Sequence, residues 1–251
     1  MNTVDLKKIG ADRTQSNLRK YAMVAVGSPS LLALARYEII YLLCSGLPGA
    51  LGLACRRMLY PFIFASFGKN VSIGRNVSIR GAGKISIGAN VMIDDNCVLD
   101  ARGDNTQIRI DDDVLVSGST VIRARNAVLH IGQGCSIGRN CLLGTDHSLI
   151  LGREVLLGAF TYLCAGGNHH FEGPEISVIS QGLKESKGIV IGDGAWLGAR
   201  TTVLDGMTVG QGSVVGAHSL VNRSIPAMVV AHGCPAKVQR ARGGNVHDEG
   251  P

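Results

Sequence analysis

Aromatic residues are scarce in this chain of 251 residues and make up only 4% of it. A core must therefore be filled by aliphatic and small side chains, which fits a narrow, repetitive interior. Pro-rich, Gly/Ser-rich and low-complexity stretches are also missing, although the chain has 34 glycines. The glycines are therefore better explained by backbone bends that a Cβ would make costly than by disorder.

CxxC pairs are absent as well, and the seven cysteines are an odd number. Both observations argue against a disulfide framework and favour a reducing compartment. The first 30 residues lack the compact apolar run and small-residue cleavage site of a secretory signal. We therefore expect a cytoplasmic protein.

The balance of charge is positive, with a formal net charge of +6 and a pI near 9.0. Such a balance favours anionic partners, which include nucleic acid, an acidic membrane face and phosphate-bearing cofactors. There is no zinc-finger spacing, RNA-binding signature or long Lys/Arg block. We therefore expect no nucleic-acid partner.

A six-residue repeat dominates the chain from residue 71 onward. An aliphatic residue is often followed by glycine in the steps VSIGRN, ISIGAN, CSIGRN, VLLGAF, IVIGDG, AWLGAR, MTVGQG and SVVGAH. The fifth residue of each step, counted from the leading aliphatic residue, is again small or apolar, as Val77 is after Ile73. Two inward positions per six residues describe a short strand and a corner, and three such faces make a coil of about 18 residues. Cys135 and Cys141 fall at small inward positions and are predicted to be inert packing residues.

These repeats resemble the hexapeptide-repeat transferase family over roughly residues 68–240. The resemblance implies a left-handed parallel β-helix, whereas the general rule for parallel crossovers favours the right hand. We therefore expect a mainly β fold with an N-terminal helical segment at 1–67, the β-helix at 68–240 and a flexible C-terminal tail at 241–251.

The repeat is interrupted at 164–188, and a long excursion from a regular scaffold is more often functional than accidental. Acyl transfer from a thioester needs a base, and the pKa of histidine is suited to that role. The stretch GGNHHFEGPEI, followed by Gln181 and IVIGDGAWLGA, resembles the sugar O-acetyltransferase branch of the family. The match implies that His169 is the catalytic base, with His170 as the second candidate, and that Asn168 and Glu172 lie beside the substrate.

Asp146 and His147 mark a smaller irregularity, where the glycine spacing stretches from six to eight residues. They are candidates to line the acceptor side one coil below the excursion. A polar corner without a functional role explains them equally well.

The tail GCPAKVQR and the hexads before it resemble the family's IGxxxWIGA…GAGSVV…GxPAK ending. The resemblance implies a pantetheine arm in a groove between subunits, with phosphates held by basic residues. The residues implied are Trp196, Ala199, Ala217, Asn222, Arg223, Lys237 and Arg240. The alternatives are a corner packing role for Trp196 and a helix-capping tail for Lys237 and Arg240. The chain departs from the family at two positions. His218 stands where glycine is usual, and Cys234 stands where valine or asparagine is usual. His218 would narrow the groove for the pantetheine arm or shift the preferred acyl donor.

The N-terminal third contains an uncharged stretch of 17 residues, 39–55, with Pro48 and Gly49 in its middle. It is short for a membrane-spanning helix, and the Pro–Gly pair breaks it. We expect a hairpin at 39–65 that docks on the inner face of the membrane, with Arg36, Arg56, Arg57 and Tyr60 near the headgroups. The alternative is a cap over the first coil or a contact with a neighbouring subunit, and docking and capping can coexist.

The resemblance implies a homotrimer that uses acetyl-CoA, or another acyl-CoA, and no metal. The expected reaction is O-acetylation of a hydroxyl on a sugar, glycolipid or polysaccharide precursor. The alternatives are N-acetylation of an amino sugar and a non-enzymatic β-helix scaffold. A metal-dependent hydratase shares the fold, but its histidine spacing fails here because positions 164, 165, 174 and 175 are Cys, Ala, Glu and Pro.

Overall fold

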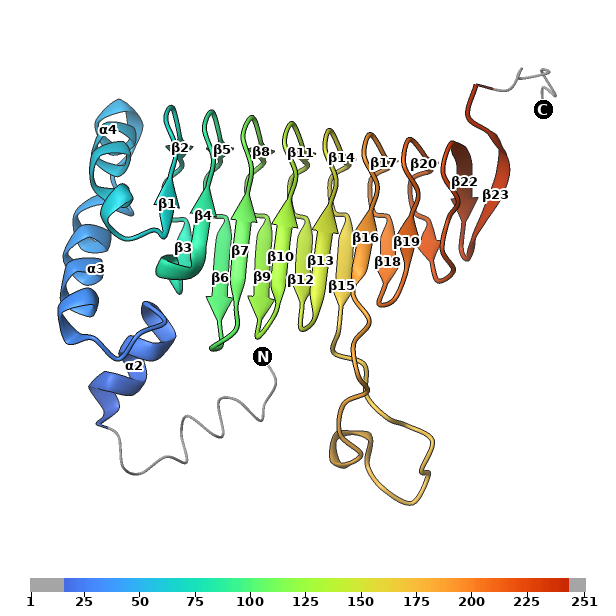
Figure 1. Cartoon of the computed structure of the whole chain (residues 1–251), viewed down its shortest axis with the longest axis horizontal. Coiled ribbons are helices and arrows are strands. Elements are labelled where there is room, and N and C mark those ends of the chain that lie inside the picture. Colours follow the sequence, from blue (N-terminus) through green and yellow to red (C-terminus); the bar gives the residue numbers. More distant parts are fainter. Residues whose placement is uncertain (1–15, 244–251) are drawn as a thin grey trace.

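The structure, a computed structural model, describes residues 16–243, so parts of the predicted N-terminal segment and C-terminal tail lie outside the described residues. Its main body is a parallel β-helix of seven coils, each made of three short strands. Helices cover the end where the β-helix begins, and a β-hairpin closes the other end (Figure 1).

Strands at the same place in successive coils pair in parallel and form three sheets, which we name A, B and C in the order in which the chain visits them. Sheet A holds β1 (Ser66–Phe67), β4 (Ile85–Ile87), β7 (Gln107–Ile110), β10 (Val128–Ile131), β13 (Ser148–Leu151), β16 (Ile189–Ile191) and β19 (Thr208–Val209). Sheet B holds β2 (Ser72–Ile73), β5 (Met92–Ile93), β8 (Leu115–Val116), β11 (Ser136–Ile137), β14 (Leu156–Leu157), β17 (Trp196–Leu197), β20 (Val214–Val215), β22 (Val229–Gly233) and β23 (Ala236–Ala241). Sheet C holds β3 (Ser78–Arg80), β6 (Val98–Arg102), β9 (Val121–Arg125), β12 (Leu142–Thr145), β15 (Tyr162–Ala165), β18 (Thr202–Leu204) and β21 (Leu220–Val221).

The interior is filled by aliphatic side chains at the inward positions that the hexads predicted. Ile73, Ile93, Val116 and Ile137 stack along sheet B, for example, and all four are buried. Cys135 belongs to the same core, and its burial raises the pKa of the thiol to about 11. An almost fully protonated thiol is a poor nucleophile, which agrees with its predicted role in packing.

The glycines of the hexads are required by close contact between coils. A Cβ on Gly158 would lie 2.5 Å from the backbone nitrogen of Ala199 in the next coil, and one on Gly138 would lie 2.6 Å from that of Ala159. The left-handed backbone conformation falls two residues later, at positions such as Asn76 and Asn140. Asparagine tolerates this conformation better than most residues. At such a corner the glycine therefore allows close contact between coils, and the asparagine adopts the left-handed backbone conformation.

The N-terminal region consists of α2 (Asn17–Ala25), α3 (Leu31–Cys44), α4 (Gly49–Leu59) and the short 3-10 helix η1 (Tyr60–Phe62). Two more 3-10 turns, η2 (Ala82–Lys84) and η3 (Val178–Ser180), lie further along. Ser16 and Ser30 cap α2 and α3 through their side chains, and the chain turns between α3 and α4 at Pro48, as predicted.

Two residues predicted to lie at the headgroup level are instead buried. Arg56 is 2% exposed and donates hydrogen bonds to the carbonyl oxygens of Ile73, Cys44 and Leu47. Tyr60 is fully buried beside the aromatic ring of Phe64. The carbonyl group of Cys44, the last residue of α3, has no partner within the helix, and the buried guanidinium of Arg56 supplies a donor to it.

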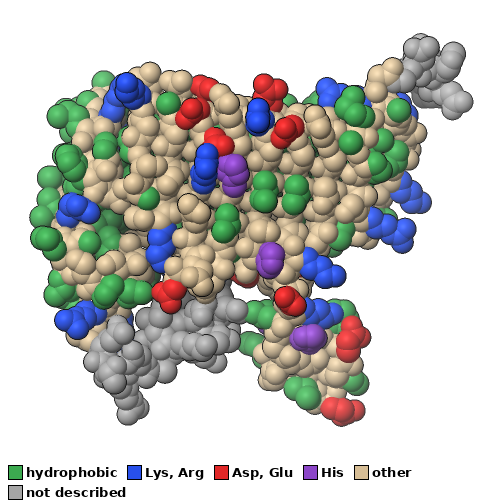
Figure 2. All heavy atoms as spheres, viewed as in Figure 1, with side chains coloured by type: hydrophobic (Ala, Val, Ile, Leu, Met, Phe, Trp, Pro, Cys, Tyr) green, Lys and Arg blue, Asp and Glu red, His purple; other side chains and the backbone are tan. Residues whose placement is uncertain are grey.

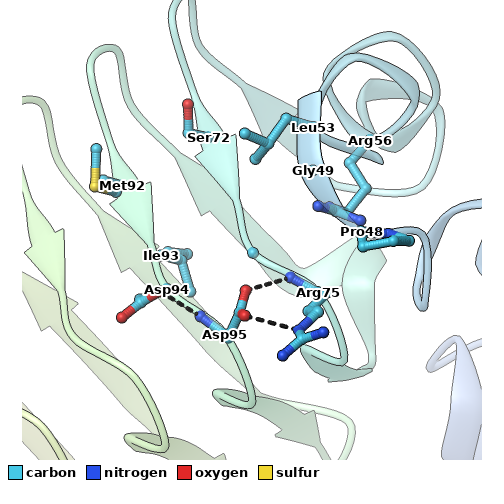
Figure 3. Close-up of a pocket in the computed structure, with 11 residues that line it drawn as sticks. Pro48, Gly49, Leu53, Arg56, Ser72, Arg75, Met92, Ile93, Asp94 and Asp95 are labelled. Atoms are coloured by element: carbon cyan, nitrogen blue, oxygen red, sulfur yellow. Dashed lines mark hydrogen bonds and ion pairs between the residues drawn. The ribbon is translucent and has the colours of Figure 1, made fainter. Parts of the chain in front are cut away.

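A pocket of about 400 Å³ lies between the start of α4 and the first two strands of sheet B (Figure 3). Leu53 and Met92 line it, together with an ion pair between Arg75 and Asp95 at 2.9 Å. The pocket belongs to the helical end of the molecule, and none of the predicted site residues lines it.

Candidate active site

The interruption of the repeat is a loop of residues 166–188 that leaves the β-helix between β15 and β16 and projects from the body (Figure 1). Strand β15 continues to Ala165, so the loop begins two residues later than predicted. The turns that join sheet C to sheet A form one edge of the triangular prism, which we call the C–A edge. The loop is an expansion of this edge between the fifth and sixth coils.

Asp205, which follows β18, holds the base of the loop. Its carboxylate accepts hydrogen bonds from the backbone N–H groups of Lys187 at 3.0 Å and Gly188 at 2.9 Å. It also accepts one from the side-chain amide of Asn168 at 3.2 Å. Asn168 therefore anchors the histidine-bearing arm of the loop to the sixth coil.

The two arms of the loop pair with each other near the histidines. The backbone N–H of His170 donates to the carbonyl oxygen of Gly182, and that of Lys184 donates to the carbonyl oxygen of Asn168. His169 lies opposite Leu183 in this antiparallel pairing. Because the backbone of both arms is paired, the position of His169 is set by the scaffold rather than by a free loop.

The imidazole of His169 is partly buried, whereas His170 is exposed. The Nδ1 of His169 is inaccessible to solvent and has no hydrogen-bond partner within residues 16–243. A histidine base is normally oriented by a partner on one ring nitrogen. No group of the described chain fills that role at the Nδ1 of His169.

The outer part of the loop is fixed by Gln181 and Lys184. The amide of Gln181 donates to the carbonyl oxygens of Gly173 and Ile176, both at 2.8 Å. The ammonium of Lys184 lies 4.4 Å from the ring centroid of Phe171 and 3.8 Å from the carboxylate of Glu172. Glu172 is exposed on the rim of the loop.

Asp146 and His147 lie directly below the base of the loop. The backbone N–H of Asp146 donates to the carbonyl oxygen of Ala165 at 2.8 Å. A Cβ on Gly166 would lie 2.9 Å from the Cβ of Asp146, so only glycine fits there. The Nδ1 of His147 is 3.1 Å from the hydroxyl of Ser148. The structure thus brings these two residues to the same edge as His169, one coil lower.

The predicted cofactor residues Ala199 and Ala217 lie on a different edge, formed by the turns from sheet B to sheet C, which we call the B–C edge. Ala199 follows β17 and Ala217 follows β20, and the backbone N–H of His218 donates to the carbonyl oxygen of Ala199 at 2.9 Å. Trp196 stands on the outer face of sheet B, half exposed, between Leu156 and Val214.

Residues that the sequence analysis missed continue this row. Ala159 occupies the place of Ala199 in the fifth coil, because the backbone N–H of Arg200 donates to its carbonyl oxygen at 2.9 Å. The residues after these alanines are Phe160, Arg200 and His218, all with φ near +60°. The guanidinium of Arg200 lies 5.3 Å from the centroid of Phe160. The signal in the sequence was the last residue of each hexad, which changes from Asn in VSIGRN to Phe, Arg and His in VLLGAF, AWLGAR and SVVGAH.

The C-terminal residues are placed by an antiparallel hairpin of β22 and β23, with a cis peptide bond between Cys234 and Pro235. Lys237 pairs with His232, and both Lys237 and Arg240 are exposed. Both residues belong to the strand that closes this end of the β-helix, so the alternative of a capping tail is compatible with the structure. Asn222 and Arg223 follow β21 and are exposed on the C–A edge.

The histidine loop and the row of alanines consequently lie on different edges of one chain. Within residues 16–243, a single copy does not place His169 beside Ala199 and Ala217. A site that uses both groups requires the C–A edge of one copy to face the B–C edge of another. Within the same range, no cluster of three or more His, Cys, Asp or Glu side chains could hold a metal ion.

Comparison with known proteins agrees with this architecture. Residues 188–223 match the family model described as "Bacterial transferase hexapeptide (six repeats)". The polysialic acid O-acetyltransferase OatWY has a similar structure, with a TM-score of 0.53 and 23% identity over 70% of this chain and 81% of that one. The fold is therefore the left-handed parallel β-helix, as predicted.

The sequence is also similar to that of a curated enzyme, the galactoside O-acetyltransferase of Lactococcus lactis subsp. lactis (strain IL1403). The two are 38% identical over 85 residues, which is 30% of this chain and 41% of the relative. The chain thus covers less than half the length of this relative. The predicted resemblance to hexapeptide-repeat acetyltransferases that act on sugars is confirmed by these matches.

Proposed function

We propose that this protein is an acyl-CoA-dependent acetyltransferase that modifies a hydroxyl group of a sugar or of a lipid-linked sugar. The observation that carries the proposal is the loop at 166–188, which interrupts seven regular coils and holds the partly buried imidazole of His169 at the C–A edge. The similarity to a galactoside O-acetyltransferase supports a carbohydrate acceptor.

In the proposed reaction, His169 takes the proton from the acceptor hydroxyl as its oxygen attacks the carbonyl carbon of the thioester. The C–O bond forms and the C–S bond breaks. The departing thiolate of CoA receives the proton from the imidazolium, which restores the neutral base. A well-placed base of this kind contributes about 10²- to 10⁴-fold to the rate. Asp146 and His147, below the loop, are proposed to contact the acceptor.

We propose further that the active enzyme is a homotrimer with acetyl-CoA bound between subunits. This arrangement is supported by the separation of His169 and the row of alanines onto two edges of one chain. The row is suited to a thin pantetheine arm because small side chains allow close approach to the backbone. Lys237 and Arg240, beyond the seventh coil, supply positive charge for the CoA phosphates.

We also propose that the protein is cytoplasmic and makes a peripheral contact with the inner face of the membrane. No helix within residues 16–243 combines the length and the apolar character needed to cross a bilayer. A peripheral contact would suit an acceptor that is carried on a lipid.

The proposal is tested with the purified full chain and three variants: His169→Ala, the neighbouring control His170→Ala and Lys237→Ala. We expect wild type and His170→Ala to bind acetyl-CoA and to transfer the acetyl group to sugar hydroxyls. His169→Ala should bind acetyl-CoA but lose about 10²- to 10⁴-fold in kcat, and Lys237→Ala should bind it more weakly. If no form of the protein binds any acyl-CoA, the scaffold alternative replaces this proposal. If His170→Ala loses turnover and His169→Ala does not, the base is His170.

A further inference from the structure

The helical end of the molecule has an inner face, which packs against the β-helix, and an outer face. Leu34, Tyr37 and Cys44 of α3 are buried against the first coils. The hydroxyl of Tyr37 donates to the carbonyl oxygen of Ile79 at 2.6 Å, and that of Tyr41 donates to the carbonyl oxygen of Val77 at 3.2 Å. The predicted role of the hairpin as a cap is thus compatible with these contacts.

Arg56 makes the helices a rigid part of the β-helix. Its Nε donates to the carbonyl oxygen of Ile73 in the first coil at 2.6 Å. Its Nη1 donates to the carbonyl oxygens of Cys44, the last residue of α3, and of Leu47 in the turn that follows. Figure 3 shows this side chain directed from α4 toward the turn at Pro48 and Gly49. One buried guanidinium therefore ties α3, α4 and the β-helix together, so their outer faces keep a fixed orientation.

The outer face of α3 and α4 exposes many large apolar side chains, although capping the β-helix requires apolar side chains only on the inner face. Leu32 is 83% exposed, Leu42 84%, Leu51 68% and Met58 71%. Further exposed apolar residues complete this surface, which we call the outer apolar face: Leu31, Ile39, Leu43 and Phe62. A helix that is apolar all round is normally buried all round. Figure 2 shows that hydrophobic side chains gather on the helical end of the molecule.

The charges on this face are basic. Arg36 and Arg57 are exposed on α3 and α4, and Arg57 donates to the side chain of Asn70 at 2.7 Å. The one acidic residue in the two helices is Glu38, whose carboxylate accepts a hydrogen bond from Tyr21 at 2.7 Å. At the helical end, Lys and Arg side chains lie among hydrophobic side chains (Figure 2).

We propose that the outer apolar face docks in the plane of an anionic lipid surface. With 14 and 11 residues, α3 and α4 would be about 21 and 16 Å long, too short to cross a hydrocarbon core of about 30 Å. Helices that lie in the interface instead insert an apolar face and place arginines at the headgroups. A second copy docked symmetrically on this face would add two more arginines to the contact, while its own α3 and α4 contain only Glu38 as an acidic residue to pair with them. Anionic headgroups neutralise these charges, which is why we choose lipid as the occupant.

This inference rests on the peripheral membrane contact proposed above and specifies the surface and the lipid charge that make it. Its readout is binding to lipid, which is measured independently of acyl transfer. The experiment is co-sedimentation of the full chain with vesicles of phosphatidylcholine alone and of phosphatidylcholine mixed with phosphatidylglycerol, at low and high salt. We expect wild type to bind the mixed vesicles at low salt, and to bind the neutral vesicles and the high-salt samples at least about tenfold more weakly, because salt screens surface charge.

Two sets of substitutions assign the binding to this face. We expect the double variant Leu32→Gln/Leu42→Gln to lose at least about tenfold in binding to the mixed vesicles, because it removes buried apolar area. Arg36→Gln/Arg57→Gln should lose the preference for phosphatidylglycerol. The control Ile150→Gln replaces an exposed apolar residue of sheet A and should bind as wild type does.

Thermal unfolding of each variant shows whether it is folded, and acetyl transfer to a soluble sugar is measured in parallel. If folded Leu32→Gln/Leu42→Gln binds the mixed vesicles as strongly as wild type, the inference is wrong. The inference is equally wrong if wild type binds neither kind of vesicle. If, in addition, Leu32→Gln/Leu42→Gln changes oligomeric size on gel filtration and the other variants do not, the face contacts protein. Loss of vesicle binding with unchanged acetyl transfer separates this inference from the proposed function.

Discussion

The B–C edge differs between its first four coils and its last three, although the backbone is the same in both. The residue with left-handed conformation is Asn76, Asn96, Ser119 and Asn140 in coils one to four, and Phe160, Arg200 and His218 in coils five to seven. The residue before it changes from Arg75, Asp95, Gly118 and Arg139 to Ala159, Ala199 and Ala217.

Large residues at such a position cost the fold about 1–2 kcal/mol each relative to residues that adopt it readily. Strained backbone that persists in a regular scaffold is a reason to suspect function. The change also begins in the coil after which the histidine loop leaves. The comparison therefore separates a structural half of the edge from the half proposed to hold acyl-CoA.

The substitutions with the largest expected effect test whether the backbone packs equally tightly in the first four coils and in the last three. We expect Gly138→Ala and Gly158→Ala each to lower the free energy of unfolding by about 3 kcal/mol, because the new Cβ would lie within 2.6 Å of backbone atoms in the next coil. Chemical denaturation measures both. A much smaller loss for one of them would show that the two halves differ in backbone as well as in side chains.

A smaller effect separates the functional halves. We expect Ala199→Leu to weaken acetyl-CoA binding by about 10- to 100-fold, because overpacking typically costs 1–3 kcal/mol. The matched change Arg139→Leu, on the same edge in the fourth coil, should leave the affinity unchanged. Isothermal titration measures both, and equal losses would remove the proposed distinction.

The smallest effect concerns the strained corner residues. We expect Phe160→Asn to raise the free energy of unfolding by about 1 kcal/mol, since relief of the left-handed strain outweighs the lost contact with Arg200. The reverse change, Asn140→Phe, should lower it by about the same amount. Thermal unfolding gives both values. If Phe160→Asn destabilises the protein, the corner is held by packing and the strain argument fails.

The stacked coils could be predicted because the hexad repeat is local: each aliphatic residue and each small partner meets its equivalents in the neighbouring coils. The histidine loop was visible for the same reason, as the place where the repeat stops. Arg56 and Tyr60 were misplaced because a charged and an aromatic residue beside an apolar run resemble a membrane flank, and the sequence does not show which carbonyl groups need a donor. Ala159, Phe160 and Arg200 were missed because the hexads were read for their inward positions.

The sequence by itself determined the β-helix, its glycine contacts and the interruption that carries His169, since these depend on a short-range period. Only the tertiary structure decided that His169 and the alanine row lie on separate edges, because the edge on which a residue falls depends on how the turns stack. It also decided that Arg56 joins the helices to the first coil and that the leucines of α3 and α4 face outward. Both outcomes depend on contacts between segments that are far apart in the chain, which no local pattern records.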